Sequence, residues 1–169
     1  MLAAAIIETE QWKKAKQVVL PGGWKPKTFS KAGYSFVRGY AAAMQGNDEA
    51  KKHVTELKVI REKGFRKNHF SRSEYLEVWE LEIKAAIKLY EKDYEAAIQL
   101  AKKATLVEEK LPSPTGPPRI LKPTYELLGE VYLKAGKPKK AKDQFTISLA
   151  RHPNRIRSLI GAARSAKLN

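Results

Sequence analysis

The sequence predicts an all-α fold built from antiparallel pairs of helices. Apolar residues recur at helical spacing along most of the chain, and no stretch shows the convincing alternation of a strand. Glycine and proline interrupt these periodic stretches where short helix connections are expected. Small residues recur where two helices would approach closely, at Ala15, Ala50, Ala97 and Ala141, with spacings of 35, 47 and 44 residues. We therefore expect a single helical domain over 1–169.

The first half of the chain carries two predicted pairs, over 2–20 and 28–64. The segment 2–20 has the pattern of a helix pair, or of the end of one. In the second pair, Thr28 or Ser30 is suited to cap the first helix. Gly46 and the Asn-Asp dipeptide after it are expected to end that helix and to cap the next one.

The second half carries two further predicted pairs, over 72–109 and 119–152, followed by a capping helix over 155–168. A proline-rich insert over 111–118 separates the two pairs, since prolines at this density exclude a helix interior. The insert and the longer helix ends also explain why the second and third spacings between the small residues, 47 and 44, exceed the first spacing of 35.

The fourth pair carries the most specific motif of the chain. Small residues at Gly129 and Ala141 let two antiparallel helices approach closely, and aromatic residues fill the space beside them. The signature positions are Tyr125, Leu128, Gly129, Tyr132, Ala141, Phe145 and Pro153. This arrangement resembles a tetratricopeptide repeat (TPR), whose signature has an aromatic, Leu-Gly, an aromatic, Ala, an aromatic and a closing Pro. Ser148 departs from the family's preference for Ala at that position.

The resemblance implies a right-handed superhelical array of helical hairpins, a TPR-like solenoid in which each hairpin packs on its neighbours. It covers most of the chain and is strong for about 119–165. The C-terminal part contains P-P-R-I-L-K-P-T-Y-E-L-L-G-E, followed by A-R-H-P-N-R and G-A-A-R-S-A. On these motifs it is also similar to the end of larger, mostly bacterial, TPR-repeat proteins of poorly defined function. We therefore expect a fragment or a short relative of a longer array. Such repeats are usually binding scaffolds and not catalysts.

The composition is strongly basic, with 33 Lys and Arg against 18 Asp and Glu and a net charge of +15. The net charge is +8 over 1–71, −2 over 72–118 and +9 over 119–169. Two basic ends favour association with acidic partners, nucleic acid or anionic surfaces. Cysteine is absent, which excludes disulfides, cysteine nucleophiles and thiolate metal sites. No apolar run is long enough to cross a membrane, so we expect a soluble protein. The sequence does not fix the compartment, and the cytoplasm is slightly favoured.

No constellation of residues in the sequence supports catalysis. The three histidines are scattered, and no phosphate-binding glycine motif occurs. A row of carboxylates lies on the third pair, at Glu74, Glu77, Glu80 and Glu82. Such a row is more typical of a solvated helix face than of an acid–base pair. We expect no enzyme activity, no cofactor and no metal.

Basic residues form two clusters that are candidates for a polyanion site. One cluster interleaves with aromatic residues after the second pair, and the other surrounds the turn of the fourth pair. The members are Arg61, Lys63, Arg66, Lys67, Lys137, Lys139 and Lys140. Basic and aromatic residues together can follow a phosphate backbone and stack on bases. The alternative is that they are solvated turn residues.

The resemblance also implies a peptide-binding groove lined by the first helices of the pairs. The positions that match are Trp79, Glu82, Tyr90, Glu126, Glu130, Leu133 and Lys134. Acidic and aromatic residues there suit a basic or apolar peptide. Two alternatives stay open: Glu126 and Glu130 form structural ion pairs with Arg119 or Lys122, and Trp79 and Tyr90 belong to the core.

The leading hypothesis is a non-enzymatic protein–protein interaction scaffold with a protein or peptide partner of unknown identity. Polyanion or nucleic-acid binding is the alternative. An exposed N-terminal hairpin would leave an apolar patch, so a homodimer through that hairpin is a further hypothesis.

Overall fold

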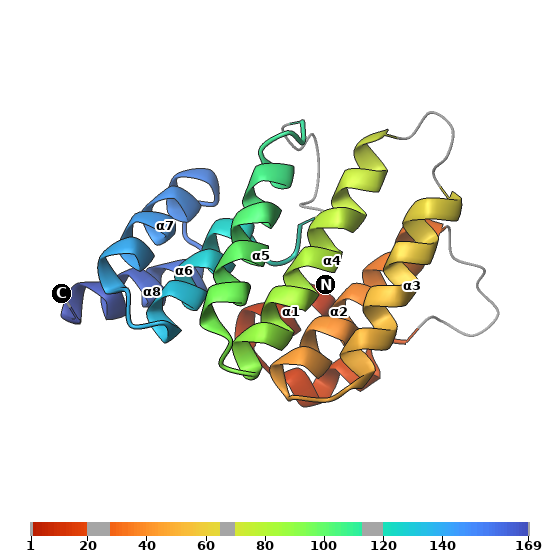
Figure 1. The fold of residues 1–169 in the computed structure, drawn as a ribbon, viewed down its shortest axis with the longest axis horizontal. Coiled ribbons are helices and arrows are strands. Elements are labelled where there is room, and N and C mark those ends of the chain that lie inside the picture. Colours follow the sequence, from red (N-terminus) through yellow and green to blue (C-terminus); the bar gives the residue numbers. More distant parts are fainter. Residues whose placement is uncertain (1, 20–27, 65–69, 113–119, 169) are drawn as a thin grey trace.

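The computed structural model describes residues 2–19, 28–64, 70–112 and 120–168. Within these ranges the chain forms eight α-helices and one 3₁₀ helix, and no β-strand (Figure 1). The elements are α1 (Leu2–Thr9), η1 (Trp12–Gln17), α2 (Thr28–Met44), α3 (Glu49–Gly64), α4 (Phe70–Tyr90), α5 (Tyr94–Glu108), α6 (Thr124–Lys134), α7 (Pro138–Arg151) and α8 (Ile156–Lys167). The all-α prediction is confirmed.

Adjacent helices pack in pairs. α2 packs on α3, α4 on α5 and α6 on α7, and α8 packs on α7. The first helices of successive pairs also contact one another, α2 with α4, α4 with α6 and α6 with α8. The N-terminal end of the chain lies near the middle of the molecule and the C-terminal end at one tip (Figure 1).

Short connections between paired helices are built by the residue types that the sequence places there. Gly46 and Gly136 both have a φ of +67°, a left-handed conformation that glycine adopts without strain. After Gly46, the side-chain oxygen of Asn47 accepts a hydrogen bond from the backbone N–H of Glu49 at 2.9 Å. Asp93 accepts one from the N–H of Ala96 at 3.2 Å and so caps α5.

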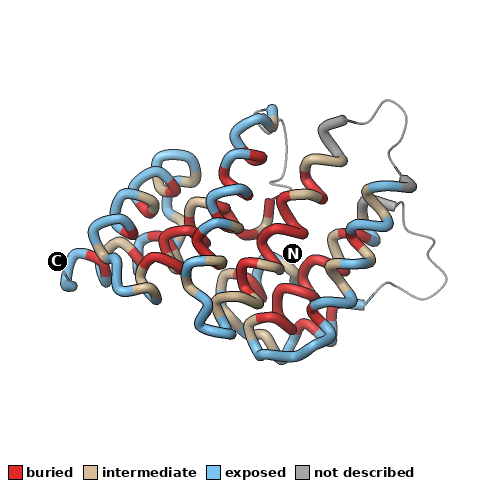
Figure 2. Tube along the Cα trace, viewed as in Figure 1, coloured by how far each residue is buried: buried red, intermediate tan, exposed pale blue. Residues whose placement is uncertain are grey.

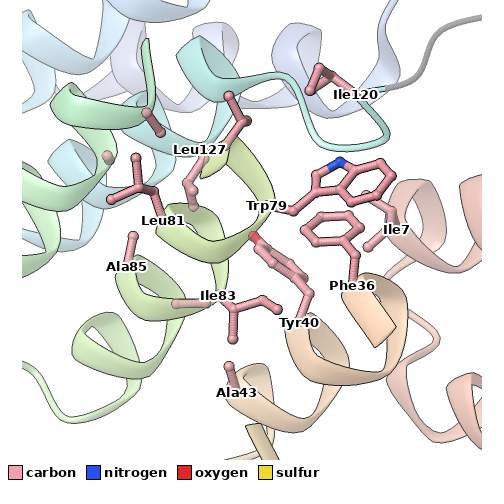
Figure 3. Close-up of a cluster of buried hydrophobic side chains, with 14 of the residues drawn as sticks. Ile7, Phe36, Tyr40, Ala43, Trp79, Leu81, Ile83, Ala85, Ile120 and Leu127 are labelled. Atoms are coloured by element: carbon pink, nitrogen blue, oxygen red, sulfur yellow. The ribbon is translucent and has the colours of Figure 1, made fainter. Parts of the chain in front are cut away.

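The core is centred on α4, which is buried along most of its length (Figure 2). Trp79 on this helix stacks on Phe36 of α2, with ring centroids 5.4 Å apart. The ring of Phe36 also packs against that of Tyr40, with centroids 5.8 Å apart. Figure 3 shows these three rings packed together with Ile7 from α1 at their edge. An N-terminal residue therefore belongs to the core of the central helices.

The fourth pair packs around one aromatic ring. Phe145 is fully buried, and a Cβ atom added at Gly129 would lie 2.8 Å from its ring. A Cβ atom added at Gly161 of α8 would come closer still. Ser148, which departs from the TPR preference, is buried and its hydroxyl lies 2.9 Å from that of Ser158 on α8. The close helix approach expected from Gly129 is therefore present, and the departing serine has a polar partner.

The segment 2–20 differs in detail from the sequence prediction. Over 2–20 the described residues form the short helix α1 and one 3₁₀ helix, because the helical pattern there is too short to build two full helices. Of the proline-rich insert, the structure describes Leu111 and Pro112, which follow the end of α5 at Glu108. The rest of the insert lies outside the described residues.

Candidate functional site

The N-terminal segment makes contacts with residues at the far end of the chain. Ile6 and Ile7 of α1 are 1% and 0% exposed. The next acidic residue, Glu8, pairs with the guanidinium of Arg155 at 2.6 Å and accepts a hydrogen bond from the N–H of Ile156 at 3.1 Å. In a helical array where each unit touches only its neighbours, residues 148 positions apart would not meet. The segment 2–10 therefore lies along the other helices and is not simply one more unit at the end of the array.

We call the surface that receives this segment the α1-binding face. Its apolar half consists of side chains of α2 and α4, among them Phe36 and Trp79 (Figure 3). Its cationic half consists of Arg155 and Arg157 at the start of α8. Burial of each isoleucine on such a surface contributes about 1.5–3 kcal/mol. The face thus combines an apolar half with a cationic half.

The cationic half has the geometry of a carboxylate receptor. No side chain caps α8 from its own N-cap position, Arg155, and the first helical N–H groups are orphan donors there. The partial positive charge of a helix N-terminus favours an anion, and Arg155 adds a full charge beside it. Glu8 supplies that anion. Glu10 supplies a second one, since its carboxylate pairs with Arg157.

A buried cluster of ion pairs also contacts the two arginines. Lys122 is 2% exposed, and its ammonium lies 3.0 Å from a Glu126 oxygen and 2.7 Å from a Glu130 oxygen. The Nε of Arg155 donates to Glu126 at 3.0 Å, and Arg157 lies 3.5 Å from Glu130. Each cation therefore has a structural carboxylate, and the arginines have a second one from the N-terminal segment.

The electrostatics of the cluster follow from burial and from these pairings. Burial alone would raise the pKa of Glu126, but the charge of Lys122 and the hydrogen bonds from Arg155 lower it to about 2. Burial raises the pKa of Glu130, although the nearby Lys122 opposes the shift. At neutral pH Glu126 is thus an ionised partner that holds Arg155 in place for Glu8.

One carboxyl group beside the cluster has no cation of its own. Glu82 of α4 is fully buried, and neither of its oxygens has a hydrogen-bond partner among the described residues. Burial raises its pKa well above the ordinary value, and the charge of Glu108 raises it further. Burial likewise raises the pKa of Tyr40, with contributions from Glu130 and Glu82. The charges of Lys122 and Arg155 oppose the shift in the pKa of Glu82, and the net effect favours its neutral form.

The predicted groove residues do not form one exposed surface. Trp79, Glu82 and Glu126 are buried, Glu130 and Leu133 are partly buried, and Tyr90 and Lys134 are exposed. The structural alternatives fit three of these positions, since Glu126 and Glu130 pair with Lys122 and Trp79 packs in the core. The core alternative is wrong for Tyr90, which is exposed. Arg119, the other partner considered, lies outside the described residues.

The predicted polyanion residues fall into two groups. Arg61 is engaged by Glu80, with its Nε 2.7 Å from the carboxylate. The side chains of Lys63, Arg66 and Lys67 lie outside the described residues. At the start of α7, Lys137 lies 3.5 Å from Glu95. Lys139 and Lys140 are exposed, and no described carboxylate pairs with them.

The other ionisable candidates have local partners. Glu77 lies 3.9 Å from Lys103, and the imidazole of His53 lies 3.0 Å from Glu56. His152 lies 3.9 Å from Glu108. In the described part of the chain, no group of three or more His, Asp or Glu side chains is placed to hold a metal ion. The structure describes no side chain of His69.

A cleft of about 670 Å³ lies beside η1, along α2 and α3. Its lining mixes cations such as Lys16 and Arg38 with Glu49 and Glu56. Glu56 accepts a hydrogen bond from Ser35 at 2.8 Å, so its carboxylate is already engaged. The cleft is therefore lined by charges of both signs, and one of its carboxylates is already engaged.

Sequence reasoning did not identify the contact between the N-terminal segment and the α1-binding face. The segment contributes Ile6, Ile7, Glu8 and Glu10, and the cationic half of the face contributes Arg155 and Arg157. The available signal was an aliphatic pair followed directly by two carboxylates in an otherwise basic end of the chain. The partners of these carboxylates are more than a hundred residues away in the sequence, and residue spacing within either segment does not predict which residues pair.

Comparison of the chain with protein-family models, with curated proteins and with solved structures gives no match. Across the described ranges, each helix is too short or too polar to cross a membrane. Functional interpretation therefore depends on the geometry of the faces.

Proposed function

We propose that this chain is a non-enzymatic scaffold of TPR type that binds a segment of a partner protein on the α1-binding face. The observation that carries the proposal is the way this face holds residues 6–10. Two aliphatic side chains are buried in the core, where Ile7 lies at the edge of the Phe36 and Trp79 rings (Figure 3), and two carboxylates pair with Arg155 and Arg157. Helix-binding surfaces of other proteins recognise amphipathic segments by the same combination of apolar anchors and charge.

The resemblance of 119–165 to a tetratricopeptide repeat supports the same function, because such arrays usually bind protein segments. The net charge of +15 supports an acidic partner, which the field would steer towards the protein.

Selection of displayed helical peptides against the full chain tests the proposal. We expect enriched peptides to lose binding to an Arg157→Ala variant and to keep binding to Arg164→Ala, a matched change of an exposed arginine on the same helix. Enriched peptides that bind both variants equally well, or no enrichment at all, would contradict binding on this face.

A second candidate, polyanion binding, is favoured by the exposure of Lys139 and Lys140 at the start of α7. It predicts that mixed oligonucleotides or heparin stay bound near physiological salt. It also predicts loss of that binding when Lys137, Lys139 and Lys140 are all changed to Glu. Fluorescence anisotropy across a salt series measures both, and binding that vanishes at moderate salt would assign the charge to background attraction.

A further inference from the structure

The contacts that hold α1 are ones that a separate peptide would make equally well. They involve the side chains of Ile6, Ile7, Glu8 and Glu10, and backbone pairing with the rest of the chain is not needed for them. The two isoleucines enter the apolar half of the α1-binding face. The two carboxylates then fall on the cationic half, at the first and third positions after the aliphatic pair.

Without the segment, the cationic half would carry unbalanced charge. Lys122, Arg155 and Arg157 would face only Glu126 and Glu130. The N–H of Ile156 would also lose its acceptor, because Glu8 fills that position and no N-cap side chain of α8 replaces it. The vacated face would therefore attract two carboxylates placed beside an apolar anchor.

The segment is held more loosely than the paired helices. α1 has eight residues, too few for a stable helix on its own, and Ile6 and Ile7 are its only buried residues. Leu2 is 45% exposed. Elements with few buried contacts open at low free energy, so α1 is suited to exchange with a competitor.

We propose that α1 is a self-bound ligand, and that the natural partner presents the same pattern. That pattern is an acidic amphipathic segment with two adjacent aliphatic residues followed by carboxylates at the first and third positions. Binding of the partner then displaces residues 2–10 from the α1-binding face. The inference deepens the proposed function and rests on it.

The self-bound segment is also a regulator of affinity. A tethered segment competes at a local concentration on the order of millimolar, so an incoming peptide binds only to the fraction of molecules in which α1 has left. Releasing α1 should therefore tighten peptide binding without any new contact.

A fluorescent peptide of residues 2–17 provides the probe, and anisotropy measures its binding to two full-length proteins. The first is the wild type. The second is the Glu8→Lys/Glu10→Lys variant, whose own segment is repelled by Arg155 and Arg157. We expect the variant to bind the peptide at least about tenfold more tightly than the wild type. A peptide with both glutamates changed to Gln should bind the variant at least about tenfold more weakly.

Charge reversal at one contact separates recognition from non-specific attraction. We expect an Arg157→Glu protein to prefer the Glu10→Lys peptide over the natural one, and the Glu8→Lys/Glu10→Lys protein to have the opposite preference. Arg164→Glu is the control, because it makes the same charge change on the exposed side of α8. Circular dichroism and thermal unfolding identify the variants that keep the fold.

Three outcomes would overturn the proposal. A folded released variant that binds no peptide would make α1 a fixed part of the fold, and equal preference for the two peptides would remove the carboxylate pattern. A concentration-dependent wild-type dimer that exchanges its segment with the peptide would make a second copy the occupant. If displayed peptides still lose binding to Arg157→Ala, the proposed function stands while this inference fails.

Discussion

The two ends of the chain are attached to the helical body by different kinds of contact. At the C-terminal end, α6, α7 and α8 close around Phe145, and glycines at 129 and 161 leave room for its ring. At the N-terminal end, α1 rests on two buried isoleucines and on ion pairs to residues far along the chain. Dense packing of three helices holds the C-terminal end, whereas two buried side chains and a few ion pairs hold the N-terminal helix.

The largest loss of stability is expected when the buried ring of the C-terminal core is removed. Phe145→Ala should lower the free energy of unfolding by about 3–5 kcal/mol, because it leaves a cavity between three helices that cannot collapse onto one another. Urea denaturation followed by circular dichroism measures the loss. A loss below about 1 kcal/mol would show that the ring is not central to this end of the molecule.

The next largest effect is expected at the ion cluster that supports both ends. Glu126→Gln leaves Lys122 and Arg155 with one buried carboxylate fewer and should cost about 3 kcal/mol at neutral pH. Glu126 has a folded pKa of about 2, below its ordinary value of 4.5, so its contribution is present above pH 4.5 and is lost as the pH falls towards 2. Wild-type stability should therefore fall over this window more steeply than that of the variant. Parallel acid profiles of the two proteins would contradict the pairing.

A smaller effect is expected when the N-terminal attachment is weakened. Ile7→Ala should cost no more than about 1–2 kcal/mol, because detachment of α1 limits what the rest of the fold loses. Hydrogen exchange should become faster in α1 and stay unchanged in α6 and α7. A global loss as large as that for Phe145→Ala would mean that the two ends are not different in kind.

The smallest effect, and one of opposite sign, is expected at Glu82. Its raised pKa means that the unfolded chain ionises above pH about 4.5 while the folded protein keeps the proton, so stability declines as the pH rises beyond that point. Glu82→Gln removes this penalty and should stabilise the protein by about 1 kcal/mol at pH 7, with little change at pH 4. Differential thermal unfolding at the two pH values measures it. If Glu82→Gln destabilised the protein at both pH values, the Glu82 carboxyl group would have a hydrogen-bond partner in the folded protein.

Local pattern was sufficient to predict what local packing decides. The all-α class, the turn glycines at 46 and 136 and the close approach at Gly129 all follow from residue spacing within one helical pair. The pairing of Glu126 with Lys122 was within reach for the same reason, since the two are four residues apart.

Contacts between distant segments could not be predicted in this way. Nothing in residues 2–10 specifies Arg155 or Arg157 as their partners, because many arginines and lysines offer the same charge. The burial of Trp79 and the exposure of Tyr90 also depend on which helices cover α4, and one helix face does not carry that information. The arrangement of elements in space decides these points.

The pairing of Glu8 with Arg155 and Ile156 has a consequence for biosynthesis. A ribosome adds roughly 5–20 residues per second, so synthesis of the 148 residues that follow Glu8, up to and including Ile156, takes on the order of 10–30 s. Throughout that interval the two carboxylates have been made, while the arginines that pair with them have not. The nascent chain therefore presents this segment to other proteins before it can bind the segment itself.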